Sequence, residues 1–394
     1  MADMTQLRYT GKATKESLRE RNDALVLQSV AQGGRARTDV VRETGLPAAT
    51  VSTIVSALVE RRLVREAGHA VSRGGKPRTL LELDEDHHRF IGVHVGTDRA
   101  TAQLLTLTGR VERRASTALP AQFDPAAVAR LIRRVSTDNV TAIGLSVPGI
   151  VDRDSVVRSA ISFGWNWYPL GSELSRRCGG VPVHVVNDAN AIALAEVARS
   201  TDPGPDLVLL WLGTGIGAGI VLDGRLHEGR GFRSGEIGHV DIGVALRCHC
   251  GLGGCLETVA ALPTILGDAS PEVVARYASW ADDSTTHALG KRVDRAAHGL
   301  ARAVSMLTAA LDVDEFVVGG PVADHRIGPR LLAAVNAVLA ARVMSGFTPV
   351  RLRYSAFGED SAVVGAAAHA IRQEFGVALT MAAEPPQARG TKES

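Results

Sequence analysis

The chain has 394 residues and lacks three features: a long apolar run, more than four cysteines and a strong net charge. No apolar run is long enough to cross a bilayer, and the first residues show no apolar signal segment. With so few cysteines, nothing indicates an oxidising compartment. Because 45% of the residues are hydrophobic and 22% are charged, the composition is that of a soluble globular protein, which we expect in the cytoplasm. The length predicts two or three domains.

The net charge of +2 conceals an uneven distribution. Residues 1–82 carry 14 Lys and Arg against 9 Asp and Glu, whereas the remainder carries 30 against 33. A basic first segment on a mildly acidic body suggests a module that meets a polyanion, although such a surplus is also common on solvated surfaces.

Apolar spacing in this basic segment predicts three helices. Residues 18–32 have helical periodicity, and Thr38 can cap a short helix over residues 39–44. Gly45 then makes a turn, and residue 47, a proline, fits the first position of a helix over residues 48–62. Two helices joined by a glycine turn are typical of a helix-turn-helix, whose second helix enters the major groove of DNA. A packing module that binds no DNA would have the same periodicity.

Two short strands, at residues 63–66 and 79–83, enclose a basic, glycine-rich tip. This hairpin is typical of the wing of a winged helix, whose cations meet phosphates or the minor groove. The exposed start of the second helix carries small residues, which suit a thymine methyl group or a phosphate. The predicted DNA contacts are Ala48, Ala49, Thr50, Ser52 and Thr53 on the helix and Arg73, Lys76 and Arg78 on the wing.

Three cysteines, Cys248, Cys250 and Cys255, lie in one glycine-rich run shortly after His239. Thiolates and a neutral imidazole are preferred zinc ligands in a closed tetrahedral site, and the glycines permit the tight turns that such a site needs. The alternatives are a disulfide or ordinary reduced thiols, but Cys248 and Cys250 are too close in sequence to pair without strain. We therefore predict a structural Zn²⁺ held by the three thiolates and His239.

The rest of the chain alternates strand-like and helical stretches, which predicts an α/β body. Expected strands are residues 90–95, 142–147, 183–186, 207–212 and 316–318, and expected helices include residues 189–199 and 293–311. Two glycine turns, one at Gly96 and one over residues 213–219, each follow a strand and can present backbone N–H groups to phosphate. Beyond these two turns, no internal repeat is detectable.

Motifs in the body resemble the ROK family (repressors, open reading frames and kinases), in its branch of transcriptional regulators with an N-terminal winged helix. The most specific are the Gly-Glu-Ile-Gly-His run at residues 235–239 and the Cys-His-Cys-Gly-x3-Cys-x-Glu run that ends at Glu257. Residues 147–151, 187–190, 213–219 and 319–320 also match. The resemblance covers residues from about 18 to about 375.

The resemblance implies a winged helix-turn-helix followed by a two-lobed actin-like, or sugar-kinase, body. We expect the DNA-binding domain at residues 1–83, the body at 84–380 and a disordered tail at 381–394. The resemblance also implies the zinc ligands His239, Cys248, Cys250 and Cys255. In ROK kinases, the aspartate that matches Asp188 is the general base, and the residues that match Asn187, Glu236, His239 and Glu257 bind sugar hydroxyls. The alternative role of Asp188 is to cap the helix over residues 189–199.

Two departures from the family pattern bear on activity. Family kinases open with Asp-x-Gly-x-Thr, and this chain has His94 and Asp98 at the aspartate and threonine positions. The first change removes a hard oxygen ligand for Mg²⁺, and the second places a carboxylate beside the phosphate turn. In the sugar site, Ile161-Ser162 stands where the family usually has Pro-Asn.

These observations predict a transcriptional regulator of carbohydrate-related genes, acting as a repressor, rather than an enzyme. Its expected partners are a double-stranded DNA operator and a sugar or sugar-phosphate effector, and it is expected to form a homodimer or homotetramer without binding a membrane. One alternative is an ATP-dependent sugar kinase with an attached DNA module, in which Asp188 stays catalytic. Another is a body that binds no ligand and serves only for dimerisation.

Overall fold

The computed structural model describes residues 15–69, 78–120, 123–200, 206–343, 349–355, 357–376 and 379. These form two compact units: the described residues up to His88 together with those of Ile371–Leu379, and Arg89–Ala370. The domain boundaries predicted at residues 83 and 380 stay predictions, and the tail expected at 381–394 lies outside the described residues. No helix in the described ranges is long and apolar enough to cross a membrane.

The first unit contains three helices and a small sheet. The helices are α1 (Lys15–Ala31), α2 (Arg37–Thr44) and α3 (Ala48–Glu60), and the strands are β1 (Arg35–Ala36), β2 (Val64–His69) and β3 (Thr79–Leu83), in the order β1-β3-β2. The glycine turn predicted between the last two helices is present, because Gly45 adopts a left-handed conformation with φ of 68°. Val26, Val40, Val51 and Val55 are fully buried at the centre of the unit.

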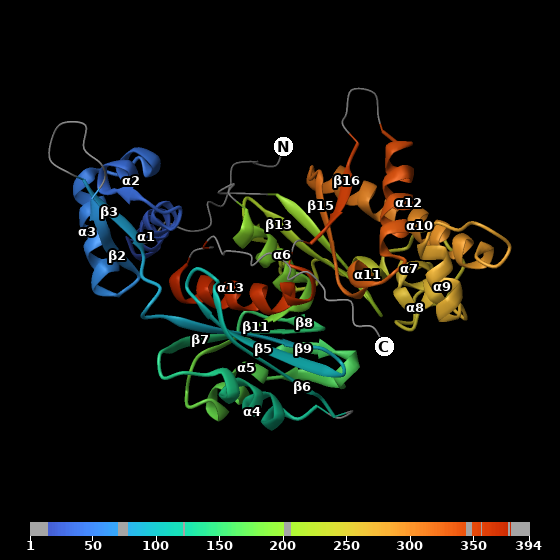
Figure 1. Ribbon diagram of the computed structural model, residues 1–394, viewed down its shortest axis with the longest axis horizontal. Coiled ribbons are helices and arrows are strands. Elements are labelled where there is room, and N and C mark those ends of the chain that lie inside the picture. The colour runs from blue at the N-terminus through green and yellow to red at the C-terminus, as the bar shows by residue number, and fades with distance from the viewer. Residues whose placement is uncertain are drawn as a thin grey trace, which may run out of the picture. The chain divides into compact units, whose positions relative to one another are not determined.

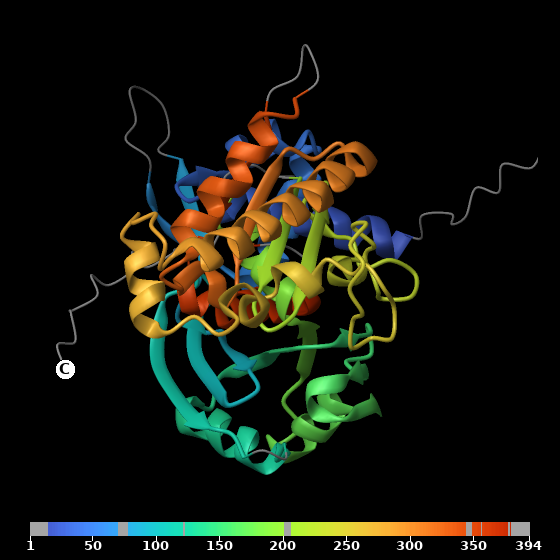
Figure 2. The same ribbon diagram turned by 90° about the vertical axis from the view of Figure 1, so that its right-hand side faces the viewer.

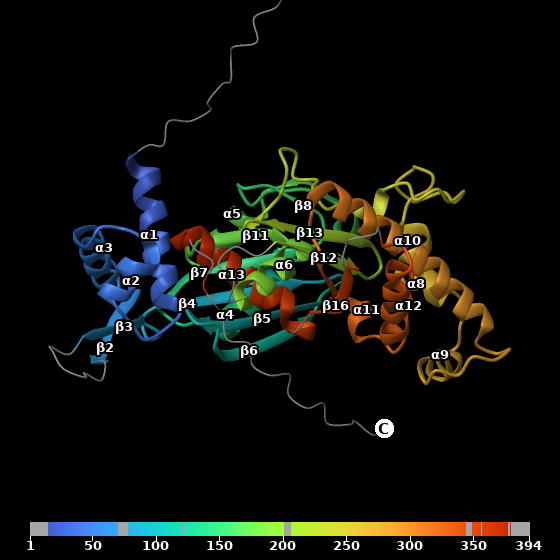
Figure 3. The ribbon, with the colours of Figure 1, turned by 90° about the horizontal axis from the view of Figure 1, so that it is seen from above.

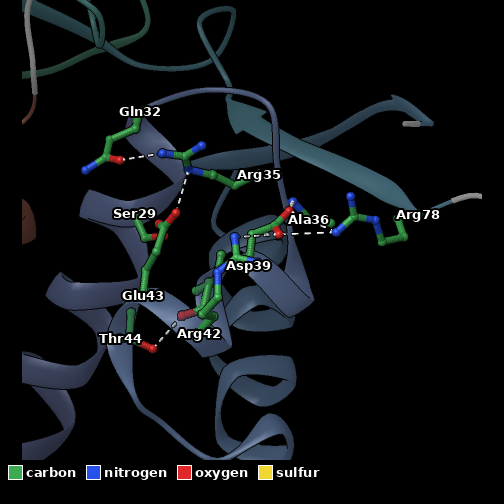
Figure 4. A network of polar contacts seen from close by, with 10 residues as sticks. Ser29, Gln32, Arg35, Ala36, Asp39, Arg42, Glu43, Thr44 and Arg78 are labelled. Atoms are coloured by element: carbon green, nitrogen blue, oxygen red, sulfur yellow. Dashed lines mark hydrogen bonds and ion pairs between the residues drawn. The ribbon is translucent and has the colours of Figure 1, made fainter. Parts of the chain in front are cut away.

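The start of α2 differs from the prediction. Thr38 does not cap this helix, which begins at Arg37, two residues earlier than predicted. Instead, the Asp39 carboxylate accepts a hydrogen bond from the Ala36 N–H at 3.1 Å. It also forms an ion pair at 3.2 Å with Arg78, the residue directly before β3 (Figure 4). An aspartate in the first turn can accept a hydrogen bond from a backbone N–H and also form an ion pair with a cation. A threonine hydroxyl can accept the hydrogen bond but has no charge for the ion pair.

The body begins with a mixed five-stranded sheet, which we call the N-sheet. Its strands are β4 (Arg89–Val95), β5 (Arg99–Thr106), β6 (Val111–Ala118), β7 (Val140–Val147) and β11 (Val183–Asn187), in the order β11-β7-β4-β5-β6. Side chains alternate along β4, so Ile91, Val93 and Val95 pack towards α4 (Pro125–Val135) and α5 (Leu170–Arg177). The opposite face is covered by α13 (Ser361–Phe375), as Figure 1 shows.

A second five-stranded sheet, the C-sheet, follows in the chain. Its strands are β12 (Leu207–Leu212), β13 (Ile216–Leu222), β14 (Arg225–Leu226), β15 (Glu315–Gly319) and β16 (Arg351–Tyr354), in the order β14-β13-β12-β15-β16. One face packs on α6 (Asp188–Arg199), and the other shares a core with α10 (His287–Leu311) and α12 (Gly328–Ala340). The last two helices lie side by side, in orange, in Figure 2.

The two sheets have the same topology, a structural repeat of which the two glycine turns are the only detectable sign in the sequence. In each, three antiparallel strands in chain order are continued by two parallel strands, which join the edge of the first strand. The covering helices meet at Gly365 of α13, where an added Cβ would lie 1.7 Å from the Ala191 carbonyl oxygen of α6. The rest of this duplication is not visible in the sequence because a sheet needs only alternating apolar residues, which different sequences supply equally well.

Shorter elements complete the body. Strands β8 (Ile150–Val151), β9 (Val157–Ala160) and β10 (Trp165–Tyr168) form a small antiparallel sheet. The 3-10 helix η1 (Ile161–Phe163) lies between β9 and β10 in the chain. Helices α7 (Glu257–Ala260), α8 (Leu262–Leu266) and α9 (Pro271–Ala278) lie beside α10 (Figure 3). The remaining pieces are α11 (Pro321–Asp324) and the 3-10 helices η2 (Ile237–His239) and η3 (Gly358–Asp360).

Candidate functional site

A cleft of about 610 Å³ lies in the body, and its lining comes from both sheets. The N-sheet contributes the turn after β4, the loop after β7 and the end of β11, and the C-sheet contributes the turn between β12 and β13. The cleft brings together all five residues predicted to bind a ligand, which are Asn187, Asp188, Glu236, His239 and Glu257.

The junction of β11 and α6 positions Asp188. Asn187 is the N-cap of α6, because its side-chain oxygen accepts from the Asn190 N–H at 3.1 Å while its amide donates to the Gly149 carbonyl at 3.0 Å. Asp188 is the first helical residue, only 8% exposed, and its carboxylate accepts from the Ala189 N–H at 2.8 Å. Burial raises the pKa of Asp188 to about 7. A carboxyl with this pKa can exchange a proton near neutral pH, so it has more than a capping role available.

Glu257 is held by two groups on opposite sides of its carboxylate. One oxygen accepts from the Ile216 N–H at 3.0 Å, and the other lies 3.1 Å from Nδ1 of His249. Gly215 lies close by, and an added Cβ there would stand 3.0 Å from the same carboxylate, which would have to shift slightly. Glu236 is exposed to the cleft, and partial desolvation raises its pKa, with Glu257 contributing like-charge repulsion.

The four predicted metal ligands lie together. The ligand atoms of His239, Cys248, Cys250 and Cys255 are all within 4.8 Å of one another. Cys248 Sγ lies 3.8 Å from His239 Nδ1, and the sulfurs of Cys250 and Cys255 are 3.7 Å apart. Four atoms about 2.3 Å from a central ion would be roughly 3.8 Å apart, so the donor set fits tetrahedral zinc in chemistry and in spacing. A disulfide is excluded in this arrangement, because its sulfurs would be about 2.05 Å apart.

The backbone explains how the cysteine loop closes. Isolated bridges join Asp241 to Cys255 and Arg247 to Gly253, and the Cys248 N–H donates to the Leu252 carbonyl at 2.9 Å. Gly251 allows the tight reversal with a φ of 91°. The backbone hydrogen bonds of the loop therefore suffice to place the three thiols close together.

His249 belongs to the site but was missed in the sequence. Besides contacting Glu257, its Nδ1 lies 3.8 Å from the sulfur of Cys248, and Cys248, His249 and Glu257 form a second group of possible metal ligands. Its position between two cysteine ligands was the available signal. Through this residue the metal cluster touches a carboxylate of the cleft.

The first glycine turn carries the two unusual residues. His94 Nδ1 lies 2.8 Å from the Ser146 hydroxyl, and burial lowers the pKa of His94 to about 4, so the ring is uncharged at neutral pH. Thr97 and Asp98 are exposed and line the cleft. His94 also lines a neighbouring cavity of about 390 Å³, together with Trp211 and Pro321.

The predicted recognition helix presents the expected surface. Ala48, Ala49, Ser52 and Thr53 are exposed and Thr50 is half-buried, whereas the opposite side of α3 is buried. The Thr53 hydroxyl donates to the Ala49 carbonyl at 3.0 Å. On the wing, Arg78 is about half exposed and paired with Asp39, while Arg73 and Lys76 lie outside the described residues.

Comparisons with known proteins identify the family. The sequence profile of the ROK family matches residues 90–373, and that of the IclR helix-turn-helix domain matches residues 24–68. The chain therefore belongs to the ROK family, and the predicted fold, a helix-turn-helix joined to a sugar-kinase-like body, is confirmed.

Individual relatives include both regulators and kinases. The chain is 31% identical over 281 residues to a xylose repressor of Caldicellulosiruptor bescii, which covers 67% of this chain and 70% of that protein. It is 33% identical over 258 residues to a glucokinase of Halalkalibacterium halodurans, covering 58% and 76%. A solved ROK family transcriptional regulator, described as a homologue of the E. coli MLC protein, superimposes with a TM-score of 0.75 at 25% identity and covers 91% of this chain and 96% of its own.

Proposed function

We propose that the protein is a sequence-specific DNA-binding regulator of carbohydrate-related genes, acting as a repressor whose DNA affinity a sugar or sugar phosphate changes. The observation that carries this proposal is the joining of a helix-turn-helix to a ROK body in one chain. A solved ROK transcriptional regulator matches both parts, over 91% of the chain. The similarity to a xylose repressor supports the link to carbohydrate genes.

The DNA interface of the proposal is the exposed start of α3. Ala48, Ala49, Thr50, Ser52 and Thr53 would face the major groove, where small side chains fit against methyl groups and phosphates. Arg73, Lys76 and Arg78 of the wing would add phosphate or minor-groove contacts. A homodimer or homotetramer would place two such helices on a palindromic operator.

The effector site of the proposal is the cleft. A sugar needs convergent acceptors for its hydroxyl groups, and Asn187, Asp188, Glu236 and Glu257 supply amide and carboxylate oxygens there. The metal cluster supports a structural zinc held by His239 and the three cysteines. Such an ion would fix the orientation of the His239 ring and hold the loop that carries His249.

The proposed response is a population shift. A sugar that contacts residues of both sheets binds more tightly when the two halves of the cleft are close together, so it favours a closed body. If the closed and open bodies differ in their affinity for the operator, the sugar changes DNA binding by the same coupling free energy.

The test is capture of genomic fragments by the purified full-length protein, with and without a pool of sugars and sugar phosphates. We expect one palindromic site whose recovery changes with one ligand. Ser52→Glu should abolish specific capture by adding charge to the recognition helix, whereas Ser172→Glu, an equally exposed serine of the body, should not. Recovery of salt-sensitive, nonspecific DNA alone would contradict the proposal.

A sugar kinase is the second candidate, because Asp188 has a pKa near 7 within the cleft and a glucokinase is among the relatives. It is disfavoured by His94 and Asp98, which replace a Mg²⁺ ligand and a phosphate contact of the family kinases. A coupled ADP-release assay over a panel of sugars tests it, and turnover that Asp188→Asn abolishes would establish it. A ligand-free dimerisation role would instead give no heat with any sugar in calorimetry.

A further inference from the structure

The lining of the cleft has a one-sided charge. Among its described residues are five carboxyl groups, on Asp98, Asp188, Glu228, Glu236 and Glu257, and no lysine or arginine. Glu228 is neutralised by an ion pair with Arg153, which lies outside the lining, at 3.2 Å. Within the described chain, no arginine or lysine forms an ion pair with any of the other four carboxyl groups.

The three histidines of the described lining are each engaged with another group. His94 is hydrogen-bonded to Ser146 and uncharged at neutral pH, because burial lowers its pKa to about 4. The Nδ1 atom of His249 faces Glu257, and His239 is a member of the metal cluster. A phosphate would therefore find no free cationic side chain in the described lining.

Several backbone N–H groups at and beside the two glycine turns are also engaged. Gly96 donates to the Arg99 carbonyl at 2.9 Å, and Gly213 donates to the Gly215 carbonyl at 3.0 Å. The Ile216 N–H donates to the Glu257 carboxylate. At the start of α6, the N–H groups of Ala189 and Asn190 donate to the side chains of Asp188 and Asn187. Phosphate sites in glycine turns depend on free donors, so these five N–H groups do not contribute to a phosphate site.

Asp98 adds a specific obstacle. It lies in the turn that would otherwise meet a phosphate, and its exposed carboxylate lines the cleft beside Gly96 and Thr97. A phosphate monoester carries close to two negative charges at neutral pH, and its repulsion by a carboxylate is weakly screened in a partly desolvated cleft. Hydroxyl groups have the opposite preference, since each donates a hydrogen bond to a carboxylate.

We infer that the cleft takes an uncharged, unphosphorylated sugar as its effector and rejects the phosphate ester of the same sugar, with Asp98 as the residue that discriminates between them. This inference rests on the proposed function, because it names the effector class of the proposed regulatory site. It narrows the expected ligand from a sugar or sugar phosphate to the free sugar.

The test is titration calorimetry of the full-length, zinc-supplemented protein with matched pairs: glucose and glucose 6-phosphate, N-acetylglucosamine and its 6-phosphate, and xylose and its 5-phosphate. In any pair of which one member binds, we expect the free sugar to bind at least about tenfold more tightly at low salt. Asp98→Asn should narrow that ratio at least about threefold by improving binding of the phosphate ester. Asp138→Asn, which changes an exposed aspartate outside the cleft, should leave the ratio unaltered.

The outcomes separate two failures. The inference is overturned if a phosphate ester binds more tightly than its free sugar. It is also overturned if Asp98→Asn, like Asp138→Asn, leaves the ratio of the two affinities unaltered. Both outcomes leave the proposed regulator intact. Failure of every pair to bind, while the protein still captures a discrete operator, overturns the inference and the effector role of the cleft together. Failure to capture an operator, with free sugars bound, contradicts the proposed function and supports the effector class.

Discussion

The two sheets of the body share a topology but differ in the turn that each offers to the cleft. In the N-sheet, the turn after β4 carries His94 and Asp98, whereas the turn after β12 keeps Gly213, Thr214 and Gly215. Strand order is maintained by ladder hydrogen bonds and the apolar core, which are spread over many residues. The chemistry of a turn depends on two or three side chains, so it can change while the fold is kept.

The covering helices also pack differently on the two sheets. In the fourth strand of the N-sheet, an added Cβ on Gly144 would lie 1.7 Å from the Ala366 carbonyl oxygen of α13. At Gly319, in the fourth strand of the C-sheet, the nearest atom of α6 is the Ile192 side chain at 3.4 Å. The backbone of α13 therefore touches the fourth strand of its sheet at Gly144, whereas α6 meets Gly319 through a side chain and brings its backbone closest at Gly219 of β13, where an added Cβ would lie 2.5 Å from the Ala189 carbonyl oxygen.

The largest expected effect comes from filling these two positions. Gly144→Ala should lower the free energy of unfolding by more than about 3 kcal/mol, because a carbonyl in a helix cannot move aside as a side chain can. Gly319→Ala should cost about 1 kcal/mol or less. Urea denaturation of both variants checks this, and similar losses would mean that the two packings are not different.

A second prediction concerns the metal loop, which only the C-sheet half carries. Cys250→Ser should lower zinc affinity at least about a hundredfold, because a thiolate ligand is lost and second-shell changes alone cost 10- to 100-fold. Metal content after dialysis against a weak chelator measures it. Cys178→Ser, which alters a half-buried thiol outside the cluster, is the control and should retain full metal. Unchanged zinc in Cys250→Ser would refute the ligand assignment.

The third prediction uses the pH dependence of Asp188. Its pKa is raised to about 7 in the folded protein, whereas a free aspartate titrates near 3.9. Between these values the unfolded chain loses a proton that the folded chain keeps, so this group's contribution to stability is full below about pH 4 and is lost as the pH rises towards 7. Asp188→Asn should remove this loss and so gain about 2.5 kcal/mol relative to wild type between pH 5 and pH 8.

Chemical denaturation at pH 5 and at pH 8 measures this difference. Asp138→Asn serves as the exposed control and should follow the wild type at both values. If Asp188→Asn loses stability with pH as steeply as the wild type does, the buried carboxyl is not the titrating group.

The smallest expected effect comes from making the N-sheet turn resemble that of a family kinase. The double variant His94→Asp and Asp98→Thr should bind Mg²⁺-ATP at least about tenfold more tightly than wild type, because it regains an oxygen ligand and loses a repelling carboxylate. Calorimetry with Mg²⁺-ATP checks it, and His94→Asp alone is the partial control. Equal affinity in all three proteins would show that these two residues do not decide nucleotide binding.

Several local features could be predicted from the sequence. The helices of the first unit and the five body strands that were expected lie within a few residues of their expected positions, and β3 coincides with its expected range, whereas strands such as β5, β6 and β16 were not expected. The grouping of three cysteines with His239 was also predicted, because its loop is short and its glycines reverse the chain locally. In each case the signal is contained within a few neighbouring residues.

Other features were missed or wrong because they depend on distant partners. The helix start at Arg37 depends on Asp39, whose carboxylate also binds Arg78 across the unit. The contact of His249 with Glu257 requires the loop to fold back onto α7. The shared topology of the sheets left no trace in the sequence beyond the two glycine turns, since backbone pairing specifies strand order without a particular side-chain pattern.

The sequence by itself determined the family, the two kinds of module, the metal-binding loop and the substitution of His94 and Asp98, since these are properties of residue type and short spacing. Only the tertiary structure decided how the cleft is charged. Carboxyl groups from residues 98, 188, 236 and 257 converge there without a lysine or arginine in the described lining, and the N–H groups of Gly96 and Gly213 are already bonded. Convergence depends on how the two sheets and their covering helices pack, and close contacts such as that of Gly365 with Ala191 set that packing.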